Sequence, residues 1–253
     1  MAYYKYRPIS RYLIESIVTP SIYFSRPRDL NDPFDCQLNI DALLNDEKFS
    51  TIESLISLKQ GMIKEGFHTN SGIHRGFQDH GIFSMSKKDI LEDGETLMWS
   101  HYAKNHTGVR LKYNFDKYMP DNAGLYGDVI KKFPNPTNFS EMYYGDYSEF
   151  IKDLEEHSMQ SSSSYELFTT FCNAYLVSKH PAWKYEHECR FIRPQFGAVE
   201  IDKDCLEEVC FGLNTSCDDM KIIKEYASKF CGCREFKRKI RGDSLYGFNE
   251  TEV

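Results

Sequence analysis

The chain has 253 residues, a formal net charge of −7, 41% hydrophobic and 27% charged residues. This balance is typical of a folded globular protein and excludes a mainly disordered or collagen-like chain. No apolar run approaches the roughly 20 residues that a membrane-spanning helix needs, and the N-terminal sequence MAYYKYRPIS lacks the apolar region of a secretory signal. We therefore expect a cytoplasmic protein with no membrane partner, in which residues 1–253 form a single domain.

The eight cysteines are spaced unevenly along the chain. Because nothing directs the chain to an oxidising compartment, we expect most of them to be buried free thiols. Cys231 and Cys233 come nearest to the spacing of metal ligands, but they lack the second pair that a zinc site requires. The sequence therefore predicts no metal site.

Charge is distributed unevenly. Residues 141–156 hold six acids and one base, whereas residues 229–241 hold six bases and one acid. The basic segment is either a surface for a polyanion or an exposed strand with solvated charges, and the second interpretation is the more common one.

Apolar residues at three- and four-residue steps predict helices over residues 10–18, 50–65, 163–176 and 218–229. Short runs of β-branched and aromatic residues predict strands over residues 3–6, 22–25, 81–86, 108–113, 129–133, 188–193, 209–211 and 234–240. Strands and helices alternate irregularly, and no glycine-rich phosphate loop is present. We expect an α+β fold with a mixed or antiparallel sheet. Residues 1–200 carry the motifs, and residues 201–253 predict a strand, a helix and a strand that complete the sheet or form a docking surface.

The first polar segment is Tyr4-Lys5-Tyr6-Arg7, which ends an aromatic strand just before a proline. Proline biases Arg7 away from the helical region, so the guanidinium can point at a phosphate or carboxylate. A surface arginine beside an edge strand is the equally common alternative.

The second segment follows the strand at residues 22–25 and contains Asn31-Asp32-Pro33. Asn and Asp bond their own backbone and Pro fixes φ, so this is a strong turn signal. Together with Asp35 and the neighbouring arginines, Asp32 is also suited to the polar rim of a ligand pocket.

In the third segment Trp99, Tyr102, Ala103 and His106 fall at helical steps, so one helix face would present an indole, a phenol and an imidazole. Such rings can hold a flat base or a nicotinamide. Large aromatic residues are usually buried, so a core position for Trp99 is the more common outcome.

The fourth segment, residues 179–193, places Glu186, Glu188 and Arg190 on one face if it forms a continuous strand. In a cleft, two such carboxylates can stabilise developing positive charge and accept a proton. At a sheet edge they would only form a ladder of ion pairs. Trp183 nearby favours the cleft.

Taken in order, the four segments resemble a bacterial and phage family known as a domain of unknown function. Its pattern is an opening aromatic strand with arginine, then N-D-P-F-D, W-x-x-Y-A-x-x-H-x-G and W-x-x-E-x-E-x-R, and it spans residues 4–190 here. Residues from about 200 onward match none of these motifs.

The order of Arg7, Ser84-Met85-Ser86 and Glu186-His187-Glu188 is more remotely similar to the arginine, serine and glutamate signature of NAD-dependent ADP-ribosyltransferases. This resemblance implies a split sheet that holds NAD in a cleft without a glycine-rich turn. It implies that Glu188 stabilises the ribose cation, that Glu186 deprotonates the acceptor and that Arg7 holds a phosphate or ribose of NAD. Ser84 and Ser86 would then orient the glutamate and the nicotinamide.

A variant of this signature that begins with histidine and has Tyr23 as its central residue fits nearly as well, and Glu188 is common to both. The residues expected to contact NAD are Arg7, Tyr23, Asn31, Asp32, Trp99, Tyr102 and His106.

The resemblance implies transfer of ADP-ribose to a macromolecular acceptor, either nucleic acid (RNA or DNA) or protein, in conflict between bacteria and phages, with an antitoxin as a further partner. The alternative is a non-catalytic module that keeps the fold and binds a nucleotide or a partner. A metal-dependent hydrolase using Asp32, Asp35 and His106 is disfavoured, because the sequence has no H-E-x-x-H or comparable ligand spacing.

Overall fold

A computed structural model describes residues 2–36, 44–64, 78–87, 94–115, 138–146, 148–149, 151–152, 155–156, 175–243 and 247–253. The helices are α1 (Arg11–Val18), α3 (Lys48–Thr51), α4 (Glu53–Lys64), α6 (Glu95–Tyr102) and α9 (Cys217–Phe230), with short 3-10 helices η1 (Pro27–Asp29), η2 (Pro181–Glu186) and η3 (Lys203–Cys205). The strands are β1 (Ala2–Arg7), β2 (Ser21–Phe24), β3 (Gly81–Ser86), β4 (Val109–Asn114), β5 (Asn138–Glu141), β6 (Tyr143–Tyr144), β7 (Ser178–Lys179), β8 (Glu188–Arg193), β9 (Gly197–Glu200), β10 (Leu206–Phe211), β11 (Glu235–Arg241) and β12 (Phe248–Glu252).

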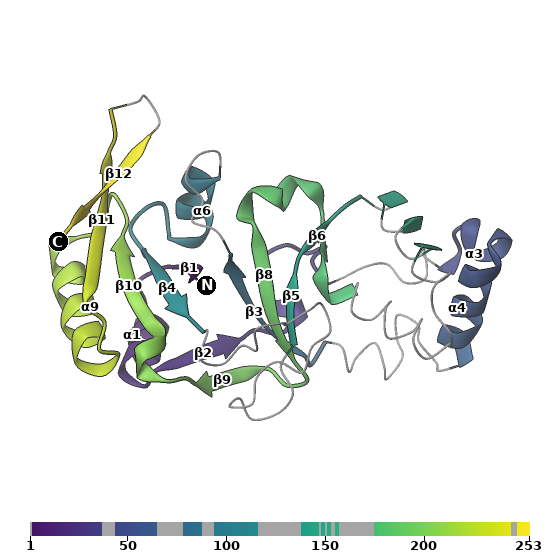
Figure 1. The fold of residues 1–253 in the computed structure, drawn as a ribbon, viewed down its shortest axis with the longest axis horizontal. Coiled ribbons are helices and arrows are strands. Elements are labelled where there is room, and N and C mark those ends of the chain that lie inside the picture. Colours follow the sequence, from purple (N-terminus) through teal and green to yellow (C-terminus); the bar gives the residue numbers. More distant parts are fainter. Residues whose placement is uncertain are drawn as a thin grey trace.

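Eight strands form one sheet in the order β12-β11-β10-β4-β1-β3-β8-β5 (Figure 1). Neighbouring strands are antiparallel except for the parallel pair β10 and β11. The expectation of an α+β fold with a mixed sheet is therefore confirmed. The strands after residue 200 extend the sheet beyond β4, and β2 pairs with β9 in a separate two-stranded sheet.

The large sheet is nearly interrupted at its centre. β1 pairs with β4 over its whole length, and β3 pairs with β8 over its whole length. Between β1 and β3, in contrast, the register consists of the single pair Tyr4 and Ser86. The two halves of the sheet are thus joined at one point and diverge from it.

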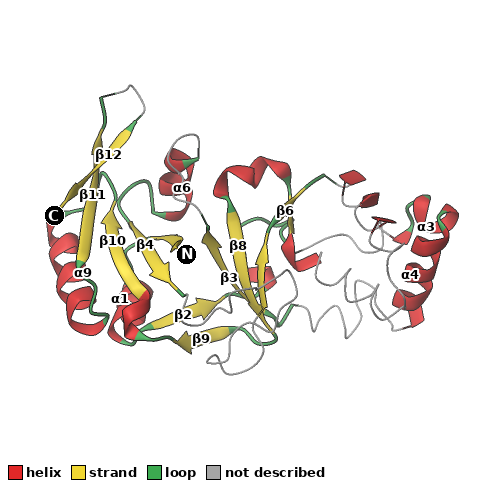
Figure 2. Cartoon of the chain, viewed as in Figure 1, coloured by secondary structure: helices red, strands yellow, loops and turns green. Residues whose placement is uncertain are grey.

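Helices α1 and α9 lie side by side against one face of the sheet (Figure 2). Both are amphipathic, and their apolar residues pack in the main hydrophobic core: Leu13, Ile17, Ile223 and Ala227. Each begins at a serine whose hydroxyl accepts a hydrogen bond from a backbone N–H of the first turn. The apolar side of each helix therefore fixes it to the sheet.

Helix α6 covers the opposite face. Its Met98 and Trp99 pack with Tyr6 of β1 and Cys210 of β10 in a second cluster. The ring of Trp99 meets that of Tyr6 edge to face, with 5.1 Å between centroids. This packing places the end of α6 beside the divergence of β1 and β3.

Most expected elements are present within one to three residues of their expected ends, including β1, β3, β8, α1 and α9. Strands β5, β6, β7, β9 and β12 were not predicted, because they are very short or lack a clear alternation of apolar and polar residues. The expected strand at residues 129–133 and the serine-rich start of the helix at residues 163–176 lie outside the described residues. In the part of the chain that the structure describes, every helix is too short or too polar to span a bilayer.

Candidate functional site

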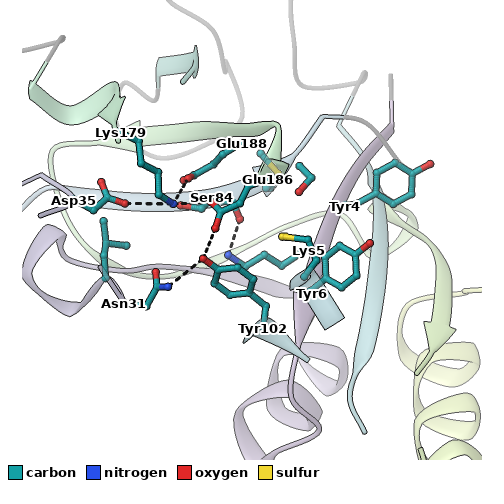
Figure 3. A pocket seen from close by; sticks show the side chains of 14 residues that line it. Tyr4, Lys5, Tyr6, Asn31, Asp35, Ser84, Tyr102, Lys179, Glu186 and Glu188 are labelled. Atoms are coloured by element: carbon teal, nitrogen blue, oxygen red, sulfur yellow. Dashed lines mark hydrogen bonds and ion pairs between the residues drawn. The ribbon is translucent and has the colours of Figure 1, made fainter. Parts of the chain in front are cut away.

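A cavity of about 520 Å³, including its opening to solvent, lies where β1 and β3 diverge (Figure 3). The cavity brings together β1, β3, the loop before residue 36, the end of α6 and the segment that enters β8. The residues that line it are Tyr4, Lys5, Tyr6, Leu30, Asn31, Asp35, Ser84, Met85, Ser86, Met98, Tyr102, Lys179, Glu186 and Glu188.

One buried ammonium joins the two glutamates. Lys179 Nζ lies 2.6 Å from Glu186 Oε2 and 2.9 Å from Glu188 Oε2, and all three side chains are at most 5% exposed. Lys179 comes from the short strand β7, which precedes η2 in the chain. Two carboxylates from separate elements therefore share one cation (Figure 3).

The two glutamates do not lie on one continuous strand, so the condition for a shared strand face is not met; the strand begins at Glu188, as predicted. Glu186 is the last residue of η2, and β8 begins at Glu188. Between them His187 adopts a left-handed conformation with φ of 45°, which is uncommon for a residue other than glycine. This turn at His187 is what directs both carboxylates to Lys179.

Arg190 supports Glu188 from behind. Its guanidinium is fully buried, with Nε 2.7 Å from Glu188 Oε1 and Nη2 2.5 Å from Asp35 Oδ2. Its Nη1 also donates to the backbone oxygen of Leu176 at 2.7 Å. Such charge-assisted bonds hold the carboxylate in a fixed orientation.

Asp32 shapes the loop that delivers Asp35. The Asp32 carboxylate accepts a hydrogen bond from the backbone N–H of Phe34 at 2.9 Å, and the N–H of Asp35 donates to the Asp32 carbonyl. This is the turn that the sequence predicted. Asp32 is thus placed in the turn, and Asp35 is the acid that faces the cavity.

Tyr102 closes the other side of Glu186. Its hydroxyl donates to Glu186 Oε1 at 2.5 Å and accepts a hydrogen bond from Asn31 Nδ2 at 3.1 Å. Asn31 and Tyr102 are both residues that the sequence assigned to the site, and the structure brings them together with Glu186.

The environments of Glu186 and Glu188 shift the pKa values of the two carboxyl groups in opposite directions. Burial raises the pKa of Glu186 above its ordinary value, despite the cation of Lys179. Burial would also raise the pKa of Glu188, but Arg190 and Lys179 together hold that pKa well below its ordinary value. Glu188 is therefore ionised near neutral pH, whereas Glu186 takes up a proton more readily.

Lys5 is the cation at the split itself. Its Nζ donates to the backbone oxygen of Ser84 at 2.6 Å and thereby bridges β1 and β3. Burial lowers the pKa of Lys5 to about 8, against the opposing effect of Glu188. Lys5 was not among the residues assigned to the site, and Arg7 was the expected ligand for a phosphate or ribose.

Five residues assigned to the site are not among those that line the cavity: Arg7, Tyr23, Asp32, Trp99 and His106. Arg7 donates from Nη1 to Ser16 Oγ of α1 at 2.9 Å, on the face of the sheet that α1 covers. Tyr23 is 53% exposed on β2, where it pairs with Ala198. In contrast, Ser84 and Ser86 of β3 do line the cavity.

The expected helical face from Trp99 to His106 is divided, because α6 ends at Tyr102 and the chain then adopts left-handed conformations as far as His106. Trp99 is fully buried in the core, and His106 stacks on it with 6.3 Å between ring centroids. Of this set, Tyr102 alone is among the residues that line the cavity.

A second network of charges ties α6 to the last strands. Arg110 of β4 contacts Glu208 at 3.0 Å and Glu250 at 2.9 Å, and Lys239 contacts Glu95 at 2.5 Å and Glu250 at 2.8 Å. Arg110, Glu95 and Glu208 are almost fully buried. Glu95 is the first residue of α6, so this network fixes one end of that helix and Tyr102 lies at the other.

The basic run in residues 229–241 is divided by this network. Lys237 and Lys239 pair with carboxylates, whereas Arg234 and Arg241 are exposed. The run therefore does not present all of its charges on one surface.

The described residues contain no group of three or more histidine, cysteine or acidic side chains arranged to hold a metal ion. Cys231 and Cys233 are buried free thiols, and burial raises the pKa of both.

Residues 98–191 match the model of a protein family described as "Protein of unknown function (DUF2971)". A DUF2971 domain is thus found in the chain, in agreement with the expected similarity to a domain of unknown function. The match begins in α6 and ends in β8, so it contains Tyr102, Lys179, Glu186, Glu188 and Arg190. Comparison with curated proteins and with solved structures gives no match.

Proposed function

We propose that the protein cleaves the bond between nicotinamide and ribose in NAD and transfers ADP-ribose to a macromolecular acceptor. The observation that carries this proposal is the pair Glu186 and Glu188, which share Lys179 beside the cavity and have opposite pKa shifts. Two neighbouring carboxylates of different acidity are the usual arrangement for acid and base roles in one site.

The chemistry requires both kinds of carboxylate. When the nicotinamide leaves with the electron pair of the glycosidic bond, the ribose develops the positive charge of an oxocarbenium ion. The ionised Glu188 stabilises that charge. Glu186 then accepts the proton that the acceptor loses as its oxygen or nitrogen attacks the anomeric carbon.

The walls of the cavity suit a dinucleotide. Tyr4, Tyr6 and Tyr102 supply aromatic side chains, and Ser84 and Ser86 supply hydroxyl groups. Aromatic faces pack against flat rings such as nicotinamide. The near interruption of the sheet between β1 and β3 is the feature that supports a split-sheet, ADP-ribosyltransferase-like fold.

The cation in this cavity that suits the pyrophosphate is Lys5 instead of Arg7. Lys5 lines the cavity, whereas the Arg7 guanidinium is directed at α1. The proposed acceptor is RNA, DNA or protein, and the proposed setting is a toxin active in conflict between bacteria and phages.

The test is incubation of the purified protein with NAD and with a cell lysate as the source of acceptors, followed by chromatography of free nicotinamide. Wild type is expected to release nicotinamide. Glu188→Gln is expected to bind NAD but to release no nicotinamide from it. Glu200→Gln, which changes an exposed glutamate of β9, serves as the matched control. Thermal unfolding of each variant shows that it is folded.

One observation favours the alternative, a non-catalytic module that binds a nucleotide or a partner. Both carboxylate oxygens of Glu188 already have a cationic partner, in Arg190 and Lys179. If wild type binds NAD but releases no nicotinamide in the presence of lysate, the result supports the non-catalytic binding module and refutes the transferase.

A further inference from the structure

Arg26 and Arg193 lie away from the cavity, at the other end of the strands that carry it. Arg193 is the last residue of β8 and pairs with Gly81 at the start of β3. Glu188, at the first position of β8, is five residues away, which corresponds to roughly 17 Å along a strand. A site at Arg193 is therefore separate from the proposed NAD cavity.

Arg193 is buried and Arg26 is partly buried. The Arg193 side chain is 7% exposed, and the Nε atoms of Arg193 and Arg26 are buried without a hydrogen-bond partner. Among the described residues, no carboxylate forms an ion pair with either of them. Arginine is almost never buried unless it is paired, so an unpaired one needs an explanation such as an absent ligand.

Each guanidinium lies over a phenylalanine ring. Arg26 Cζ is 3.6 Å from the ring centroid of Phe196, and Arg193 Cζ is 5.4 Å from that of Phe24. Stacking uses the flat face of a guanidinium and leaves its N–H donors in the plane of the group. The donors thus stay available for an oxyanion.

The two phenylalanines that stack on the arginines both lie beside Gly81. A Cβ atom at Gly81 would lie 2.7 Å from Cβ of Phe24 and 2.9 Å from Cα of Phe196. Gly81 also pairs with Arg193. Ser25, next to Arg26, forms a bridge with Ile82, next to Gly81. The backbones of Arg26 and Arg193 therefore lie on either side of the same end of β3.

We propose that Arg26 and Arg193 form a binding site for a phosphate group, either inorganic phosphate or the phosphate of a small nucleotide. Arginine forks match phosphate oxygens in geometry and charge. A phosphate would supply acceptors for guanidinium donors to which the described residues offer none. This site goes beyond the proposed transferase activity and does not depend on it.

The test is thermal unfolding of the whole chain with increasing sodium phosphate, compared with sodium chloride at equal ionic strength. The melting temperature of wild type is expected to rise more in phosphate than in chloride, because ligand binding stabilises the folded state. Arg26→Met and Arg193→Met are each expected to weaken phosphate binding by about tenfold or more. Arg28→Met changes an exposed arginine two residues beyond Arg26 and is expected to behave as wild type.

The same titration with AMP and with adenosine distinguishes the sources of the phosphate. Stabilisation by AMP and not by adenosine extends the site to nucleotides, and stabilisation by inorganic phosphate alone restricts it to the free ion. Equal gains in phosphate and chloride, or wild-type phosphate binding by both methionine variants, would overturn the proposal. If one of these variants does not fold, the other decides the outcome.

Discussion

Substitution of Lys179 by methionine tests the central electrostatic feature of the cavity. The Lys179 side chain is 3% exposed, and its ammonium lies within 3 Å of both Glu186 and Glu188. Removal of one partner from a buried ion pair typically costs about 3 to 5 kcal/mol, because an uncompensated charge is left behind. We expect a loss of this size in the free energy of unfolding at pH 7.

The loss should depend on pH. Burial and Glu188 both raise the pKa of Glu186, and Lys179 opposes them. Without the lysine, the pKa of Glu186 in the folded state should rise further above its value in the unfolded chain. The folded state then binds the proton more tightly, so the variant gains stability as pH falls, by at most about 1.4 kcal/mol per pH unit. This contribution is complete below the unfolded pKa and is lost as pH rises through the folded pKa.

The assay is equilibrium unfolding in urea at pH 7 and pH 5. Lys184→Met, which changes an exposed lysine of η2, is the matched control and is expected to change the free energy of unfolding by less than about 0.5 kcal/mol. The double variant Lys179→Met/Glu186→Gln should recover part of the loss, because it removes one of the two repelling charges. A loss below about 1 kcal/mol, or an equal loss at both pH values, would refute the assignment of Lys179 as the shared cation.

Two further outcomes are expected. Because the pKa of Lys5 is lowered to about 8, the affinity of wild type for ADP-ribose should fall by up to about tenfold between pH 7 and pH 9. In calorimetry, Lys5→Met should bind ADP-ribose more weakly than wild type, with an affinity that does not change with pH. A steep pH dependence of the affinity in that variant would exclude Lys5 as the cause. At His187, where φ is 45°, valine should cost about 1 to 2 kcal/mol more than glycine in urea unfolding, and equal stabilities would show that the left-handed turn is not required.

The sequence predicted the strands that border the cavity because their short apolar and aromatic runs are strong local signals. It also predicted Glu188, Tyr102 and Asn31 near one another through their motifs. It did not predict the partners of these residues. Arg190 and Asp35 are 155 residues apart in the chain, and only the tertiary fold brings the loop of Asp35 into contact with β8.

Local structure explains why some residues do not lie where the sequence placed them. A strand face shared by Glu186 and Glu188 would require β8 to extend back through His187, but the chain turns at His187 and Glu186 ends η2. Arg7 ends an aromatic strand as expected, but Ser16 of α1 is its hydrogen-bond partner. Trp99 followed the general tendency of large aromatic residues and lies in the core.

Helix α6 connects regions that would otherwise be independent. Glu95 at its start belongs to the charge network of Arg110 and Lys239, and Tyr102 at its end holds Glu186 beside the cavity. A helix of eight residues moves largely as one body. In a genetic screen for loss of activity, substitutions at Arg110 or Lys239 should therefore be recovered alongside those at Glu186. Their recovery would reflect displacement of α6 and would not identify the last strands as a second active site.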